Sequence, residues 1–155
     1  MIKISDKRLL QLKKNFKGKR IAVIGDMMLD IYFWGDVKRI SPEAPVPVLE
    51  AEDEFYRFGG AANCSLHIAK LNGVAHPVGV IGYDNFGTVF NSLLAEQNIS
   101  HHGIILDDTR PTTAKTRVIA DSQHIVRIDK ESKETIGQNI QNKIFDYVKS
   151  IIKNK

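Results

Sequence analysis

Residues 58–82, FGGAANCSLHIAKLNGVAHPVGVIG, constrain the possible fold more than any other stretch of the chain. Gly59 and Gly60 can adopt backbone conformations that a Cβ would forbid, which favours a tight turn. The apolar residues after Ala62 recur at helical spacing, and the apolar run at 75–81 is typical of an inner β-strand. A turn, a helix and a strand in this order predict an α/β fold with a mostly parallel sheet flanked by helices.

The glycine pair itself has two interpretations. Without a Cβ, it lets a ligand come close to the backbone, and Asn63 in the first turn of the helix would face that ligand. Glycine pairs are also common in turns that only serve packing. The spacing alone favours neither interpretation.

The composition is that of an ordinary folded protein. The chain has 155 residues, of which 43% are hydrophobic and 26% charged, so residues 1–155 are long enough to form a single domain with a core. The net charge is +4, and basic residues gather at 13–20 and 149–155 without interleaved aromatics. This pattern predicts solvated helix faces and no nucleic-acid partner.

Cys64 is the single cysteine, so an intrachain disulfide is excluded and a cytoplasmic location is expected. No apolar run approaches the roughly 18 residues of a membrane span, so we expect no membrane partner. No further metal-ligating residue is found at a suitable spacing from the histidine pair at 101–102, or from Cys64 and His67. We therefore predict no metal site.

A second constraint is the run Arg20–Gly25, which is typical of a central strand of a parallel sheet. Asp26 and Asp30 should lie just past the carboxyl end of this strand. Two carboxylates there could orient sugar hydroxyls or a cation, or could simply cap the loop. No dinucleotide-binding glycine motif follows the strand, and the chain has no phosphate-binding loop of the Walker type.

The region that follows predicts strands of a small auxiliary β-sheet, and a later region predicts a hairpin. Residues 31–37 and 45–58 read as half-exposed strands, and three prolines at 42–47 argue against a central position. Residues 112–120 and 123–129 should form a hairpin around Asp121 and Ser122. Strand alternation places Thr113, Lys115 and Arg117 on one face, where they could bind an anion or remain solvated.

The remaining helices are predicted from periodicity and capping residues. Ser5 should begin a helix that continues to Phe16, Asp84 should cap a second helix, and 135–152 should form a last packing helix. A short strand is expected near 103–106.

These motifs resemble the ribokinase-like (PfkB) carbohydrate kinases. The resemblance rests on the GGAAN sequence at 59–63, the spacing on to Gly82, and the G-x-D-x-x-G pattern at 82–87. Within that family, residues 25–30, 34–48 and 110–120 resemble the D-glycero-β-D-manno-heptose-7-phosphate kinases. The likeness extends over nearly the whole chain.

The resemblance implies a sheet flanked by helices and covered by a small β lid, built from about 31–58 and 112–129, through which relatives form homodimers. It also implies that Asp30, Gly59, Gly60 and Asn63 bind the sugar. Asp26 is a further substrate-binding candidate because of its predicted place at the end of the strand. Lys115 and Arg117 are our own candidates for the 7-phosphate of the substrate, because alternation points them the same way.

The chain departs from the family pattern at two points. Asn72 stands where a glycine usually ends the helix, and asparagine is the next best residue there. The Gly-Ala-Gly-Asp motif that supplies the catalytic base in such kinases is absent from the sequence. We therefore expect an incomplete domain, the sugar-binding half of a heptose-7-phosphate kinase, without catalytic residues and inactive alone.

The intact enzymes would use ATP and Mg²⁺, neither of which this chain should bind strongly, and we predict no nucleotide-binding residue within it. Two alternatives remain. The chain could be a non-catalytic module that binds a sugar phosphate or mediates dimerisation, or it could belong to a kinase of another sugar in the same family.

Overall fold

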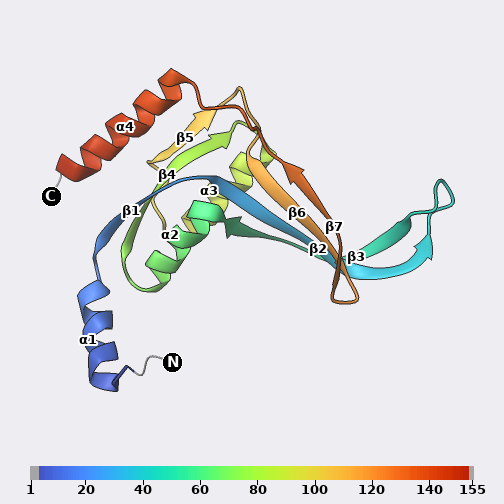
Figure 1. The fold of residues 1–155 in the computed structure, drawn as a ribbon, viewed down its shortest axis with the longest axis horizontal. Helices are drawn as coiled ribbons and strands as arrows, with labels where there is room; N and C mark the ends of the chain where they lie inside the picture. The colour runs from blue at the N-terminus through green and yellow to red at the C-terminus, as the bar shows by residue number, and fades with distance from the viewer. Residues whose placement is uncertain (1–3, 154–155) are drawn as a thin grey trace.

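The computed structural model describes residues 4–153, which form two β-sheets and four helices (Figure 1). In chain order the elements are α1 (Asp6–Phe16), β1 (Arg20–Ile24), β2 (Met27–Ile40), β3 (Pro47–Gly59), α2 (Gly60–Lys70), β4 (Val74–Gly82), α3 (Asn85–Glu96), β5 (Ile104–Asp107), β6 (Thr113–Ala120), β7 (Gln123–Lys130) and α4 (Gln138–Lys153). The last helix begins at Gln138, three residues later than its periodicity predicts.

The first sheet, here called the core sheet, has three parallel strands in the order β1-β4-β5. The inner position predicted for 75–81 is confirmed, since β4 pairs on both sides. The central position predicted for β1 is wrong for this structure. Within residues 4–153, β1 pairs only with β4, and Ile24 is 60% exposed.

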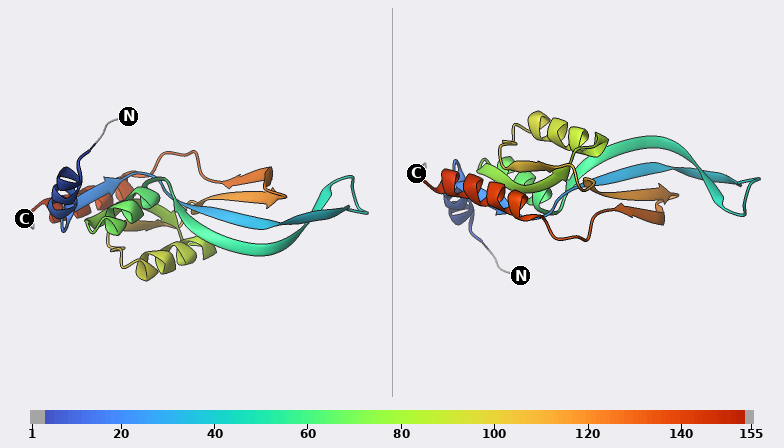
Figure 2. Two further views of the ribbon diagram at one scale, coloured as in Figure 1. Left: turned by 90° about the horizontal axis from the view of Figure 1, so that it is seen from below. Right: turned by 90° about the horizontal axis from the view of Figure 1, so that it is seen from above.

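The second sheet, here called the lid sheet, has the order β3-β2-β6-β7 and mixes antiparallel with parallel pairs. The predicted auxiliary sheet is therefore confirmed, with proline-flanked β3 at one edge. The β2–β3 hairpin projects beyond β6 and β7 (Figure 2). Asp121 and Ser122 join β6 to β7 with φ angles of 49° and 64°, the conformation of a tight hairpin turn.

The helix ends follow local capping rules. The Ser5 hydroxyl accepts a hydrogen bond from the Arg8 amide, and Asp84 accepts one from the Gly87 amide at 2.9 Å. After α2, Asn72 has a φ of 63°, and the Gly73 amide donates to the Ile68 carbonyl at 2.9 Å. This is the left-handed helix ending for which asparagine was expected to substitute for glycine.

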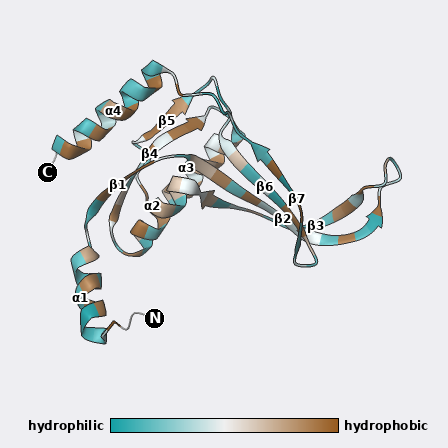
Figure 3. Ribbon diagram, viewed as in Figure 1, coloured by the Kyte–Doolittle hydropathy of each residue, from teal (hydrophilic) through white to brown (hydrophobic). Residues whose placement is uncertain are grey.

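The hydrophobic core lies where the base of the lid sheet meets α2, α3 and β4. Its buried members include Leu29 and Ile31 of β2 and Phe58 of β3, whose ring packs edge-on against Phe90 of α3 at 5.2 Å between centroids. By contrast, α1 buries no side chain, although α1 and α4 both carry alternating hydrophobic and hydrophilic bands (Figure 3). The core therefore fixes the inner end of the lid and leaves its outer end exposed.

Candidate functional site

Asp30, Gly59 and Asn63 come together at the base of the lid. Asp30 lies within β2, Gly59 ends β3, and Asn63 lies in the first turn of α2. A Cβ built on Gly59 would be 3.0 Å from Oδ2 of Asp30, so the glycine makes room for the carboxylate. Asp30 is thus a strand residue of the lid sheet, and its predicted place in a loop after β1 is wrong.

Gly60 has a different role from Gly59. Its φ is +53°, and a Cβ there would lie 2.6 Å from the carbonyl oxygen of Asp26. The next amide, that of Ala61, donates to the same carbonyl at 3.0 Å. Gly60 therefore satisfies the packing interpretation of the glycine pair, whereas Gly59 leaves the carboxylate of Asp30 accessible.

A cavity of about 570 Å³, here called the α2–β3 cavity, opens beside these residues. Asp30 and Asn63 both line it. The other lining residues come from β2, β3, α2 and α3: Tyr32, Tyr56, Arg57, Phe58, Leu66, His67, Lys70, Leu93 and Gln97. The mixture of aromatic, amide and charged side chains is suited to a polar ligand with an apolar face, such as a sugar.

Arg117 reaches the site from the neighbouring strand β6. Its Nη1 atom donates to Oδ1 of Asp30 at 2.7 Å, and its guanidinium lies 5.2 Å from the centroid of the Tyr32 ring. Partial burial acts to lower the pKa of Arg117. The hydrogen bond to Asp30 and the negative charge of that carboxylate together have the larger effect, so the pKa of Arg117 is raised. The hydrogen bond from Arg117 therefore holds the Asp30 carboxylate in a fixed orientation.

Lys115, on the same face of β6, is held by two carboxylates. Its Nζ atom lies 2.9 Å from Asp129 and 3.0 Å from Glu131. The hydrogen bonds to Asp129 and then to Glu131 raise the pKa of Lys115. Both predicted phosphate ligands, Lys115 and Arg117, thus already have acidic partners, and their binding of a phosphate stays a prediction.

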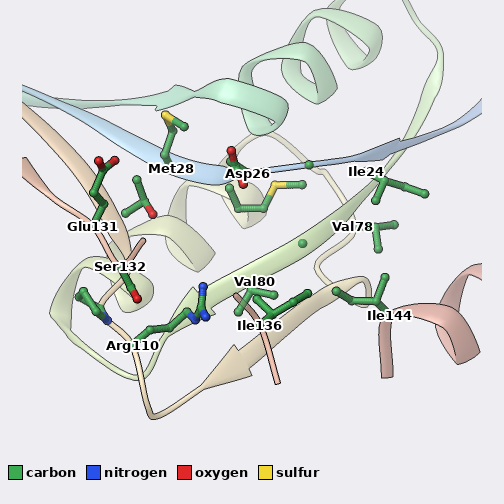
Figure 4. A pocket seen from close by; sticks show the side chains of 15 residues that line it. Ile24, Asp26, Met28, Val78, Val80, Arg110, Glu131, Ser132, Ile136 and Ile144 are labelled. Carbon is green, nitrogen blue, oxygen red and sulfur yellow. The ribbon is translucent and has the colours of Figure 1, made fainter. Parts of the chain in front are cut away.

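Asp26 lies apart from this group, in a second cavity of about 280 Å³ (Figure 4). Glu131 and Ser132 line one side of that cavity, and Ile136 and Ile144 line another. The structure therefore divides the predicted site, with Asp30 and Asn63 in the α2–β3 cavity and Asp26 in the second one. Whether Asp26 contacts a substrate stays a prediction.

Sequence reasoning missed six polar residues of the α2–β3 cavity: Tyr32, Tyr56, Arg57, His67, Lys70 and Gln97. One signal was available, because Asn63, His67 and Lys70 follow one another at spacings of four and three, which places them along one side of a helix. Arg57 could not be found in this way, since its place depends on the pairing of β3 with β2 opposite Asp30.

The described residues do not fit a nucleotide with its metal. Within residues 4–153, no three His, Cys, Asp or Glu side chains are grouped so as to hold a metal ion. In the second cavity, Asp26 and Glu131 would repel phosphates, and Arg110 is already bonded to Asp107 and to the Glu134 carbonyl.

Among the helices within residues 4–153, none is long and apolar enough to span a bilayer.

The sequence is similar to known proteins over most of its length. Residues 19–152 match the model of the pfkB family of carbohydrate kinases. The chain is 44% identical over 130 residues to the bifunctional protein HldE of Helicobacter pylori strain J99, and 40% identical over 136 residues to that of Helicobacter hepaticus. These alignments cover 84% and 88% of this chain but only 28% of each relative.

Solved structures agree at the level of the fold. Arabidopsis thaliana ribokinase, complexed with ribose and ATP, has a TM-score of 0.60 at 18% identity, covering 82% of this chain and 42% of that one. The fructokinase of Halothermothrix orenii has a TM-score of 0.55 at 19% identity, covering 77% and 40%. The fold is therefore ribokinase-like, and the chain belongs to the pfkB family of carbohydrate kinases.

Proposed function

We propose that this chain is the sugar-binding portion of an ATP-dependent heptose-7-phosphate 1-kinase, which forms heptose 1,7-bisphosphate for ADP-heptose and lipopolysaccharide core synthesis. The observation that carries the proposal is that Asp30 and Asn63 both line the α2–β3 cavity, with Gly59 beside the Asp30 carboxylate. The similarity to HldE proteins supports heptose as the sugar.

The chemistry of these residues suits a sugar. The Asp30 carboxylate can accept hydrogen bonds from two neighbouring hydroxyls, and the Asn63 amide can both donate and accept. Arg117 already holds Oδ1 of this carboxylate, so Oδ2, beside Gly59, is the oxygen that we expect to bind the ligand. The absence of a side chain at Gly59 lets a sugar ring approach that oxygen closely. In our proposal Gly60 supports this arrangement through its contact with the Asp26 backbone.

ATP and Mg²⁺ would serve the intact enzyme, in which the nucleotide supplies the phosphoryl group. In this proposal the role of this chain is to bind and orient the acceptor sugar, and it should bind neither ATP nor Mg²⁺ strongly. We further propose that the lid sheet forms the contact of a homodimer, and that the protein acts in the cytoplasm. The expected partner is a sugar phosphate rather than a nucleic acid.

Calorimetric titration of the purified chain with heptose, ribose and fructose tests the proposal. Heptose should bind best, and Asp30→Asn should weaken its binding roughly tenfold or more, because a hydrogen bond to a charged group is lost. Asp53→Asn, an exposed change on the same hairpin, is the control. If neither heptose nor heptose 7-phosphate binds, or if heptose binds equally well to Asp30→Asn, the proposal is wrong.

The second cavity, where Asp26 and Glu131 would repel phosphates, favours one alternative, a module that binds the sugar phosphate without catalysis. An ATP-dependent phosphorylation assay on the 155-residue chain separates the two. We expect no appreciable turnover from this chain alone, and turnover after the missing portion of an HldE-like kinase is supplied. Preference for another sugar in the same titrations would instead support a different kinase of the family.

A further inference from the structure

Three basic side chains line the same cavity as Asp30 and Asn63. They are Arg57 of β3 and His67 and Lys70 of α2. In the part of the chain that the structure describes, none of the three takes part in an ion pair, whereas Lys115 and Arg117 both do. Arg57 and Lys70 therefore bring positive charge to the cavity without an ion-pair partner among residues 4–153.

The two ends of this basic group are positioned by different elements. The Arg57 guanidinium lies 4.9 Å from the Phe55 ring centroid and 5.8 Å from that of Tyr32, so aromatic rings orient it without an acidic partner. His67 and Lys70 continue the side of α2 that begins with Asn63, and seven residues of helix extend about 10 Å. A ligand held at Asn63 could thus reach Lys70 along the helix.

We propose that Arg57 and Lys70, assisted by His67, form a binding site for the phosphate group of the sugar phosphate. This inference rests on the proposed function, because it takes the sugar ring to lie at Asp30 and Asn63. A guanidinium pairs with two phosphate oxygens at once, and an ammonium adds a compact positive charge. A phosphate at Lys115 would instead meet Asp129 and Glu131, which already hold that ammonium and would repel a dianion.

The test compares heptose 7-phosphate with unphosphorylated heptose, each titrated into the same chain by calorimetry. We expect the wild-type chain to bind the phosphorylated sugar more tightly. The double variant Arg57→Gln/Lys70→Gln should lose at least about tenfold in affinity for heptose 7-phosphate, because charged hydrogen bonds are lost, and should bind heptose as before.

Two matched variants complete the design. Lys7→Gln/Lys14→Gln removes the same charge from exposed positions of α1 and should leave both affinities unchanged. Lys115→Gln should also keep the preference for the phosphorylated sugar. If the preference survives in Arg57→Gln/Lys70→Gln, or disappears in Lys115→Gln, the assigned phosphate site is wrong while the sugar site stands. If neither sugar binds the wild-type chain, the proposed function fails and the phosphate site fails with it.

Discussion

The guanidinium of Arg117 is hydrogen-bonded to the carboxylate of Asp30 at 2.7 Å, although the two residues are 87 positions apart in the chain. Their side chains are 20% and 19% exposed, so the pair is neither fully buried nor free in solvent. The bond joins β6 to β2 at the point where we place the sugar. It therefore links the stability of the lid sheet to the orientation of a ligand-binding group.

Replacing Arg117 with Met should lower the free energy of unfolding by about 2 kcal/mol, between the values typical of surface and buried pairs. Part of this loss is the cost of leaving Asp30 charged without a partner. The double variant Arg117→Met/Asp30→Asn should therefore lose less than the sum of the single variants in urea denaturation. Lys38→Met, which removes exposed pairs with Asp36 at 3.7 Å and Glu50 at 3.6 Å, should cost under about 0.5 kcal/mol. If the loss of unfolding free energy in the double variant equals the sum of the losses in the single variants, Arg117 and Asp30 are not coupled.

Gly60→Ala should be more destabilising than Gly18→Ala. Both residues have a positive φ, +53° and +73°, so alanine strains the backbone at either position by about 1 kcal/mol. Only at Gly60 would the new Cβ also clash, at 2.6 Å from the Asp26 carbonyl oxygen, whereas nothing lies within 4 Å at Gly18. We expect an extra loss of about 1–2 kcal/mol in chemical denaturation. Equal losses of stability in Gly60→Ala and Gly18→Ala would show that the backbone at residues 25–26 shifts to accommodate the new Cβ without a cost in stability.

Asp107 should make stability depend on pH in the acidic range. The hydroxyl and the amide of Thr109 donate to its carboxylate and, with a contribution from Arg110, hold the pKa of Asp107 below its ordinary value despite burial. The unfolded chain therefore binds the proton more readily, so this stabilisation is full above about pH 4. It is lost as the pH falls through the lower pKa of the folded state.

Unfolding curves measured from pH 7 to pH 3 check this expectation. Asp107→Asn should reduce the loss of stability between about pH 4 and pH 3, because the asparagine does not titrate. Asp108→Asn alters an exposed neighbour and should leave the slope unchanged. An identical slope in wild type and Asp107→Asn would mean that other carboxylates account for the acid sensitivity.

Asn-Gly in place of Asp121-Ser122 should stabilise the β6–β7 hairpin. Both native residues have positive φ angles, 49° and 64°, which asparagine and glycine adopt more easily. The change should raise the free energy of unfolding by about 0.5–1 kcal/mol, measurable as a higher melting temperature. Ser122→Val is the opposite test, because a β-branched residue resists this conformation and should lower the melting temperature.

Local signals in the sequence predicted the elements correctly where a residue acts on its immediate neighbours. The turn at Asp121, the cap at Asp84 and the helix ending at Asn72 all depend on groups within a few residues. Asp30 was misplaced because the chain leaves the core sheet after Ile24 and enters the lid sheet at Met27, a change that hydrophobic patterning does not reveal.

The cavity was less predictable than the elements around it. The leucines of α1 recur at helical spacing, yet none of the residues of this helix is buried, because burial depends on what lies opposite. Arg57 reaches the cavity only because β3 pairs with β2 in one register, between residues 27 positions apart in the sequence. Such contacts depend on the assembled structure, and no short sequence window contains them.

The connection between the core sheet and the lid sheet is very short. Only Gly25 and Asp26 separate β1 from β2, and the Asp26 carbonyl is pinned by the amide of Ala61 at the start of α2. The lid sheet therefore cannot swing like a domain on a flexible tether. Any movement of the lid sheet over a sugar must change the backbone dihedral angles of Gly25 and Asp26. That change would also move β1 and the first turn of α2, where Asn63 lies.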